Sequence, residues 1–272
     1  MSYRSRHIKP KIKGLFRKKF FQRKLFWVFL LAFMLIAATA YFILFFSKIQ
    51  VENIEVSGSE KIASSEIESI AWHRVNRRLF NTGIVNILSK SIFLVNKEDV
   101  MQDILKRFPA IKAVAVEKKF PNGMVVKVTE RKPFAVFCRG TEFGECYVID
   151  DSGVIFEAMK GPIEDAMIIR ELAHDKEIFV GEDIIDANIM DMIAKVEKSL
   201  KNNFQIEVKE AFVSNPLIFR TSEQWKIYFD LESDIDMQII KMNAILRDEI
   251  PASTRKNLQY IYLQYKDRAY YK

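Results

Sequence analysis

The sequence predicts an α+β protein in which one transmembrane helix precedes two folded domains. Three observations support this class: an uncharged run at 25–46, a succession of strand, helix, helix, strand and strand behind it, and then a longer segment dominated by strands. We therefore expect a basic cytoplasmic tail over 1–24, a transmembrane helix over 25–46, a first domain over 47–133 and a β-rich second domain over 134–272.

The uncharged run has the length and flanks of a membrane anchor. Its 22 residues would extend roughly 33 Å as a helix, against ~30 Å for the hydrocarbon core of a bilayer. The preceding 24 residues include ten Lys or Arg and no acidic residue, so the positive-inside rule predicts a cytoplasmic N-terminus and an extracytoplasmic bulk. The alternative is a cleaved signal peptide with a small-residue site at 38–40. The apolar run continues to Phe46, however, beyond the roughly 7 to 15 residues of a signal h-region.

The net charge of +7 comes from residues 1–24, the basic head. Outside it, 32 Lys and Arg face 35 Asp and Glu. The folded part has no basic excess and no recognisable nucleic-acid-binding module, so we expect no nucleic-acid partner.

Local signals define the first domain. A strand is expected over 49–56, and a helix is expected from Ser65, which has capping-box spacing to Glu68. Asn96 can cap a second helix that Pro109 ends.

Two β-rich runs then follow at 111–119 and 124–131. The linking segment 120–123 contains Asn-Gly, which can adopt the positive φ angles of a tight hairpin turn. Two helices against one face of such a small sheet would complete a compact α+β unit.

The second domain reads as mainly antiparallel strands with flanking helices. A hairpin is expected from 134–138 and 146–150, with a seven-residue loop. Apolar residues recur at helical spacing over 187–200 and 235–246. We interpret these stripes as core.

Cys138 and Cys146 are the two cysteines of the chain. A symmetric hairpin would place them opposite each other on the extracytoplasmic side, where a disulfide can persist. A slipped register would instead leave two free thiols. Two thiolates without nearby histidines fall short of a zinc site.

The order of these segments resembles the FtsQ/DivIB family of cell-division proteins. The resemblance rests on IQVENIEVSG, then FPAIKAVAVEKKFPNGMVVKVTERKPFAVF, then CYVIDDSGVIFE, and on WKIYFD and YIYLQYKDRAYYK near the end. It implies a short basic tail, one membrane helix, a polypeptide-transport-associated (POTRA) domain and a β-rich domain. Two departures stand out: residues 75–95 make a longer connection than the family pattern, and Tyr262 and Gln264 occupy its acidic and arginine positions.

The resemblance implies a bitopic scaffold of the divisome, at the septum of the cytoplasmic membrane. Such a protein would bind FtsB-like and FtsL-like partners and connect them to septal peptidoglycan synthases. The alternatives are a membrane-anchored envelope enzyme and a POTRA protein serving secretion or assembly. Nucleophile elbows, zinc-binding His-Glu-x-x-His motifs and phosphate-binding glycine loops do not occur. We therefore expect no enzymatic activity, no catalytic or metal-binding residues and no cofactor.

The C-terminal strands carry the predicted partner site. Alternation over 259–265 sends Ile261 and Leu263 inward and Tyr260, Tyr262 and Gln264 outward. Tyr265 resembles a family contact position. Alternation would place it inward, but near the turn at 266–267 either direction is possible. After a turn, the chain runs to its end without a covering tail, which would leave a sheet edge for an added strand. The predicted contact residues are Tyr260, Tyr262, Gln264, Tyr265, Arg268, Tyr270 and Tyr271.

Overall fold

The computed structural model describes residues 24–81, 86–139, 145–159, 166–171, 177–265 and 267–272. Nearly all of the predicted basic tail therefore lies outside the described residues. The apolar run expected to form a membrane helix is helical as α1 (Lys24–Phe45), which is long and apolar enough to cross a bilayer and is not buried against the protein. A helix that is apolar on all sides and uncovered along its length is suited to lipid.

The described chain forms two compact units. The first contains α1 with the chain up to Asn53, together with His73–Val95 and Lys118–Met124. The second contains Ile54–Trp72, Asn96–Glu117 and Val125–Lys272.

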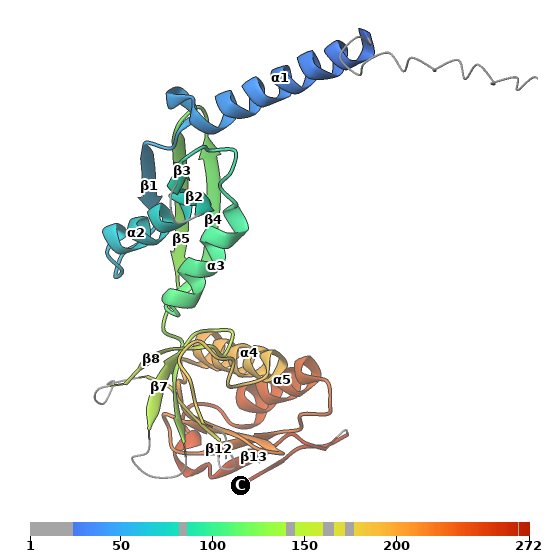
Figure 1. Cartoon of the computed structure of the whole chain (residues 1–272). Helices are drawn as coiled ribbons and strands as arrows, with labels where there is room; N and C mark the ends of the chain where they lie inside the picture. Colours follow the sequence, from blue (N-terminus) through green and yellow to red (C-terminus); the bar gives the residue numbers. More distant parts are fainter. Residues whose placement is uncertain (1–23, 82–85, 140–144, 160–165, 172–176, 266) are drawn as a thin grey trace, which may run out of the picture. The chain divides into compact units, whose positions relative to one another are not determined.

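The expected succession of strand, helix, helix, strand and strand is present (Figure 1). Its elements are β1 (Asn53–Ser57), α2 (Ser64–Val75), α3 (Lys97–Arg107), β4 (Ile111–Lys119) and β5 (Gly123–Glu130). The strands pair in the order β1-β5-β4. Asn96 caps α3 as expected by accepting a hydrogen bond from the Glu98 backbone N–H. Helix α2 begins one residue before Ser65, which therefore lies within its first turn.

Two details of this region differ from expectation. Between α2 and α3 the chain forms an additional antiparallel hairpin, β2 (Arg77–Asn81) and β3 (Asn86–Ser89). The β4–β5 hairpin is present, but neither Asn122 nor Gly123 has a positive φ. The reason is that Gly123 already belongs to β5, which leaves a three-residue connection in place of a two-residue Asn-Gly turn.

The second sheet has nine strands in the order β14-β13-β12-β11-β10-β9-β6-β7-β8. Five of the pairings are antiparallel, and β6–β9, β9–β10 and β12–β13 are parallel. The strands are β6 (Ala135–Arg139), β7 (Cys146–Ile149), β8 (Ile155–Ala158), β9 (Ile168–Glu171), β10 (Val208–Val213), β11 (Leu217–Thr221), β12 (Lys226–Phe229), β13 (Tyr260–Tyr262) and β14 (Tyr270–Tyr271).

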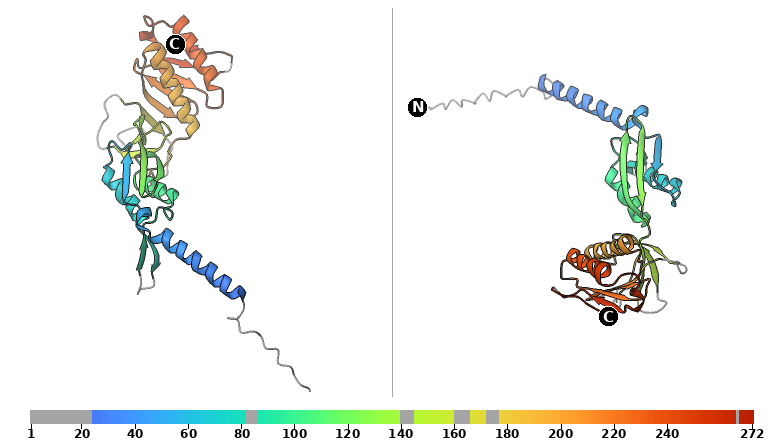
Figure 2. Two further views of the ribbon diagram at one scale, coloured as in Figure 1. Left: turned by 90° about the horizontal axis from the view of Figure 1, so that it is seen from above. Right: turned by 180° about the vertical axis from the view of Figure 1, so that it is seen from behind.

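Two helices cover one face of this sheet (Figures 1 and 2). Asp186 caps α4 (Ala187–Phe204) and Asp234 caps α5 (Ile235–Ala244), each by accepting from backbone N–H groups of the first turn. A parallel strand pair needs a long crossover, and α4 provides it between β9 and β10, as α5 does between β12 and β13.

The helical stripes form the core, as expected. Ile193, Val196 and Leu200 of α4 are fully buried, as are Met242 and Leu246 at and beyond the end of α5. They belong to one apolar cluster with the inward side chains of the sheet. The opposite face of the sheet is left without a helix among the described residues.

Candidate protein-interaction edge

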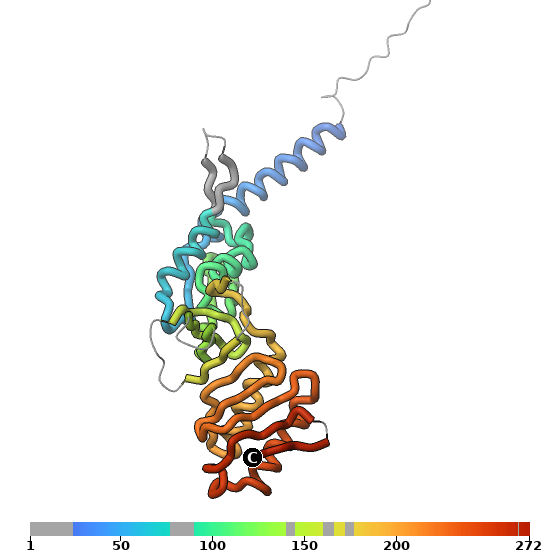
Figure 3. The backbone as a smooth tube through the Cα atoms, turned by 90° about the horizontal axis from the view of Figure 1, so that it is seen from below, coloured from blue at the N-terminus to red at the C-terminus, as the bar shows by residue number. Residues whose placement is uncertain are grey.

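The predicted partner site lies at one end of the nine-stranded sheet. Strand β13 runs parallel to β12, and β14 pairs antiparallel with β13 as the last strand of the described sheet at this end. The C-terminal segment, red in Figure 3, occupies this terminal position. A terminal strand presents backbone groups that no strand of the described sheet uses.

The inward residues of β13 behave as the alternation predicts. Ile261 and Leu263 are 0% and 1% exposed, and Ile261 joins the cluster that α4 and α5 cover. Tyr260 and Tyr262 therefore lie on the opposite face of the sheet, which α4 and α5 do not cover and which we call the open face.

A tyrosine patch, defined as Tyr228, Tyr260 and Tyr262, covers this part of the open face. The Tyr228 and Tyr262 rings stack with centroids 4.3 Å apart, and Tyr260 lies 4.7 Å from Tyr262. Removal from water, and then the neighbouring Tyr228, raises the pKa of the Tyr262 hydroxyl. Tyr260 and Tyr262 of the predicted site therefore lie together, and the sequence analysis missed Tyr228. Tyr228 lies opposite Tyr262 because β12 pairs with β13. The sequence alone does not reveal that these two strands are neighbours.

The remaining predicted residues gather where the chain turns from β13 into β14. Tyr265 is 44% exposed, so of the two directions left open it takes the outward one. The reason is that β13 ends at Tyr262, after which the alternation of a strand no longer applies. The Tyr265 backbone carbonyl accepts from Lys241 Nζ at 2.8 Å, and its ring meets that of Tyr270 edge-on at 5.3 Å. Arg268 donates to the Tyr270 hydroxyl at 3.3 Å, and Gln264 is partly exposed.

The hydrogen bonds of β14 define which of its backbone groups face outward. Lys272 N–H donates to the Tyr260 carbonyl, and Tyr260 N–H donates in return to the Lys272 carbonyl. Residue pairs of an antiparallel ladder alternate between bonded and non-bonded positions. Tyr271, paired with Ile261, is therefore non-bonded, and its N–H and C=O point away from β13. Tyr270, paired with Tyr262, uses its backbone groups within the sheet.

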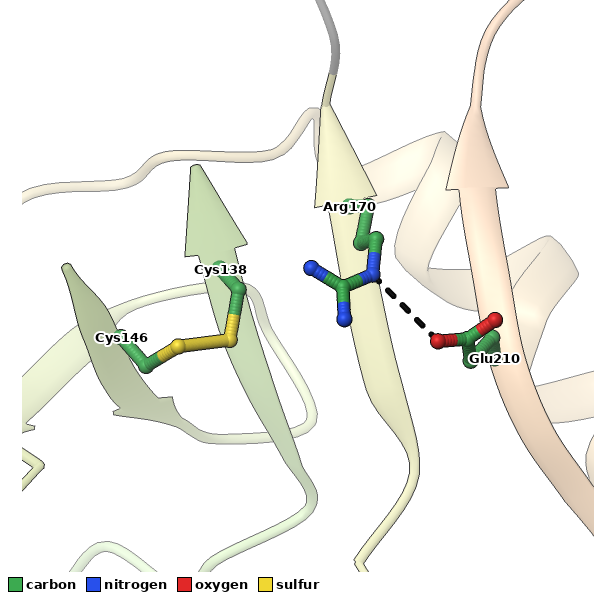
Figure 4. The surroundings of a disulfide bond; sticks show 4 residues. All are labelled: Cys138, Cys146, Arg170 and Glu210. Carbon is green, nitrogen blue, oxygen red and sulfur yellow. Dashed lines mark hydrogen bonds and ion pairs between the residues drawn. A yellow bond between two sulfur atoms is a disulfide. The ribbon is translucent and has the colours of Figure 1, made fainter. Parts of the chain in front are cut away.

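The open face continues from the tyrosine patch into a charged row. Glu210 of β10 accepts from Arg220 at 2.5 Å and from Arg170 at 3.4 Å. Beyond Arg170 lies a disulfide between Cys138 of β6 and Cys146 of β7, which stand opposite each other in register (Figure 4). Tyrosines, an ion-pair network and a disulfide therefore share one face of the sheet.

Residues 130–133, Glu-Arg-Lys-Pro, form contacts that the sequence analysis missed. The Glu130 carboxylate accepts from the backbone N–H groups of Glu60, Lys61 and Ile62, just before α2. Burial opposes ionisation of Glu130, but these three N–H groups outweigh it and lower its pKa.

Arg131 forms an ion pair with Asp150, whose side chain is 1% exposed. Asp150 also accepts from the Ser152 hydroxyl and the Val154 backbone N–H. Burial would raise the pKa of Asp150, but these hydrogen bonds and Arg131 lower it below its usual value. Asp150 thus combines the turn role expected from the sequence with an ion pair to a residue distant in the chain.

Among the described residues, no group of three or more His, Cys, Asp or Glu side chains is placed to hold a metal ion.

Known proteins resemble this chain over its first domain and beyond. Residues 49–131 match the family described as POTRA domain, FtsQ-type. A relative from Streptomyces coelicolor named cell division protein FtsQ is 27% identical over 135 residues, which cover 49% of this chain and 45% of the relative. A protein of the same name from Streptomyces griseus is 29% identical over 110 residues, which cover 40% of this chain and 45% of the relative. The matches span less than half of each relative's length.

Proposed function

We propose that this chain, a cell-division protein of the FtsQ/DivIB family with an FtsQ-type POTRA domain, acts as a non-enzymatic scaffold of the divisome. Its transmembrane helix would hold it in the cytoplasmic membrane with the folded part outside. The POTRA domain would occupy 47–133 and the β-rich domain 134–272. Confinement to the membrane raises the effective concentration of partners, which suits a recruiting role.

The observation that carries this proposal is the outward edge of β14 beside the tyrosine patch. A backbone carbonyl of an added strand from an FtsB-like partner would accept a hydrogen bond from the Tyr271 N–H, and a backbone N–H of that strand would donate to the Tyr271 carbonyl. These main-chain hydrogen bonds would supply affinity. The exposed rings of Tyr265, Tyr270 and Tyr271 offer amphipathic contact area of the kind enriched at protein interfaces. An FtsL-like protein would join through that partner, and septal peptidoglycan synthases would be recruited and regulated through the assembly.

A proline scan of the edge tests the docking mode. Full-length protein in nanodiscs is titrated with the extracytoplasmic segment of an FtsB-like partner. Tyr271→Pro removes the outward N–H, so we expect affinity to fall roughly tenfold, from one lost hydrogen bond and the obstructing ring. Tyr271→Ala is the matched control, since it removes the side chain but keeps the N–H, and should weaken binding less. Equal affinity for the proline variant and the wild type would exclude this edge.

The tyrosine patch is tested separately. Tyr262→Ala removes aromatic area from the open face and should weaken binding several-fold while circular dichroism remains unchanged. Phe179→Ala is the control, because Phe179 is 56% exposed but lies outside the edge. Tyr270→Pro is a poorer probe, since Tyr270 uses its N–H within the sheet and the variant would loosen β14 itself.

Imaging of a tagged copy in dividing cells separates the scaffold from other envelope roles. Septal bands are expected for a division protein. A uniform envelope signal would instead favour an envelope enzyme or a secretion role.

A further inference from the structure

The chain that leaves the membrane helix is joined at once to two other segments. Ile92 N–H donates to the Ile49 carbonyl, and Val51 N–H donates to the Lys90 carbonyl. Glu52 N–H donates to the Asn122 carbonyl in the β4–β5 connection. Segments 47–52, 90–93 and 120–122 thus form one juxtamembrane surface, all within the first compact unit.

This surface is bonded to the last turn of α1 itself. Ser91 is buried, and its hydroxyl donates to the Ile43 carbonyl at 2.7 Å. Gln50 Nε2 donates to the Leu44 carbonyl, also at 2.7 Å. Ile43 lies two residues before the end of α1, which is about 3 Å along the helix axis. The juxtamembrane surface therefore begins at the level where the apolar span ends.

Two large aromatic side chains are exposed on this surface. Phe93 is 54% and Phe120 is 59% exposed, and their ring centroids lie 5.5 Å apart. In Figure 1, α1 ends beside the connection between β4 and β5, which contains Phe120. Removing two exposed phenylalanine rings from water is favourable.

The end of α1 carries the same type of side chain. Tyr41 packs on Phe45 at 5.2 Å, and Phe42 stacks on Phe46 at 4.1 Å. Tyr concentrates at the headgroup level of membrane proteins, and Phe is among the apolar side chains that interfacial segments bury at the boundary of headgroups and acyl chains. The Phe93–Phe120 pair extends this aromatic belt from the helix onto the folded chain.

We propose that Phe93 and Phe120 insert into the bilayer interface at the C-terminal end of α1, so that the juxtamembrane surface rests on lipid. Exposed Lys48 follows the end of α1, and exposed Lys90 and Lys119 precede Phe93 and Phe120 in the chain. Cations at this level attract anionic lipid headgroups. Exposed Glu52 is the opposing charge on the same surface. The membrane anchor then consists of α1 and the juxtamembrane surface, and together they set the orientation of the first unit relative to the bilayer.

Fluorescence depth measurements test this inference on the full chain in phosphatidylcholine and phosphatidylglycerol liposomes. A polarity-sensitive thiol probe is attached to the Phe93→Cys or the Phe120→Cys variant. Unsubstituted protein is labelled in parallel to verify that the bridged Cys138 and Cys146 do not react with the probe. His73→Cys, an exposed position of the same unit, and Met237→Cys, which is 53% exposed in the second unit, are matched controls.

We expect lipids spin-labelled near the headgroup to quench the probes at 93 and 120 at least twofold more than either control. Aqueous iodide should quench them correspondingly less. Adding Phe120→Glu to the probe at 93 should reverse both differences, because a charged side chain resists entry into the interface. Equal quenching at all four positions would overturn the proposal, even if the division role holds.

Discussion

At the residue scale, Asp150 illustrates how one acidic side chain serves two structural purposes. Its carboxylate closes the turn at Ser152 through hydrogen bonds and neutralises Arg131, which also donates to the Pro109 carbonyl. A buried charge of this kind is stable only while its partners remain, so removing one partner leaves an uncompensated charge.

The pKa of Asp150 makes a prediction about acid stability. Because its pKa in the folded protein is below the unfolded value of 3.8, its contribution is fully present above about pH 4. That contribution is lost as the pH falls through the lower folded pKa. Asp150→Asn should lower the free energy of unfolding by about 3 kcal/mol at pH 7, and should reduce the loss between pH 5 and pH 2.

Urea unfolding of the full chain in detergent at several pH values measures this effect. Asp151→Asn is the matched control, because Asp151 pairs with Lys112 at the surface and should cost less than about 1 kcal/mol. Similar unfolding of the two variants at pH 7 would contradict the assigned role of Asp150.

At the element scale, the β6–β7 hairpin combines an in-register pairing with a covalent link. Cys138 and Cys146 are opposite each other and eight residues apart. A bridge across so short a loop restricts the unfolded chain modestly.

We predict that the bridge forms in protein exported from the cytoplasm. Both cysteines should resist alkylation until reductant is added, and the mass should be about two hydrogens lower than that of the dithiol. Replacing both cysteines by alanine should lower the free energy of unfolding by roughly 2 kcal/mol. Partner binding should persist, since β6 and β7 lie at the other end of the sheet from β14. Ready alkylation without reductant would refute the bridge.

At the scale of the whole molecule, topology depends on the contrast between the basic head and α1. The head has no acidic residue, so nothing in it offsets the charge bias that would retain it in the cytoplasm. The proposed scaffold role would require the folded units on the opposite side.

Charge reversal beside the helix tests this orientation. Replacing Arg17, Lys18, Lys19, Arg23 and Lys24 by Glu should impair or invert insertion, since the bias acts near the span. Protease added to spheroplasts should digest the bulk of the wild type and spare that of an inverted variant.

The control reverses five exposed lysines of the folded part and should remain protease-sensitive: Lys61, Lys97, Lys106, Lys198 and Lys256. Protection of the wild-type folded part would refute the proposed topology.

The sequence by itself determined the features that depend on neighbouring residues. An uncharged run predicted α1, Asn96 predicted the cap of α3, and helical spacing predicted that Ile193 and Val196 are core. Each is encoded within a few residues, because capping and amphipathic periodicity are local properties. The alternation in β13 likewise placed Ile261 inward.

Only the tertiary structure decided what depends on partners distant in the chain. The parallel pairing of β12 with β13 brings Tyr228 onto Tyr262, and the register of β14 directs the Tyr271 N–H outward. The hydrogen bond from Ser91 to Ile43 places the Phe93–Phe120 pair at the end of α1. Strand order and register are set by side-chain packing over the whole sheet, so no local pattern specifies which surface the folded chain presents.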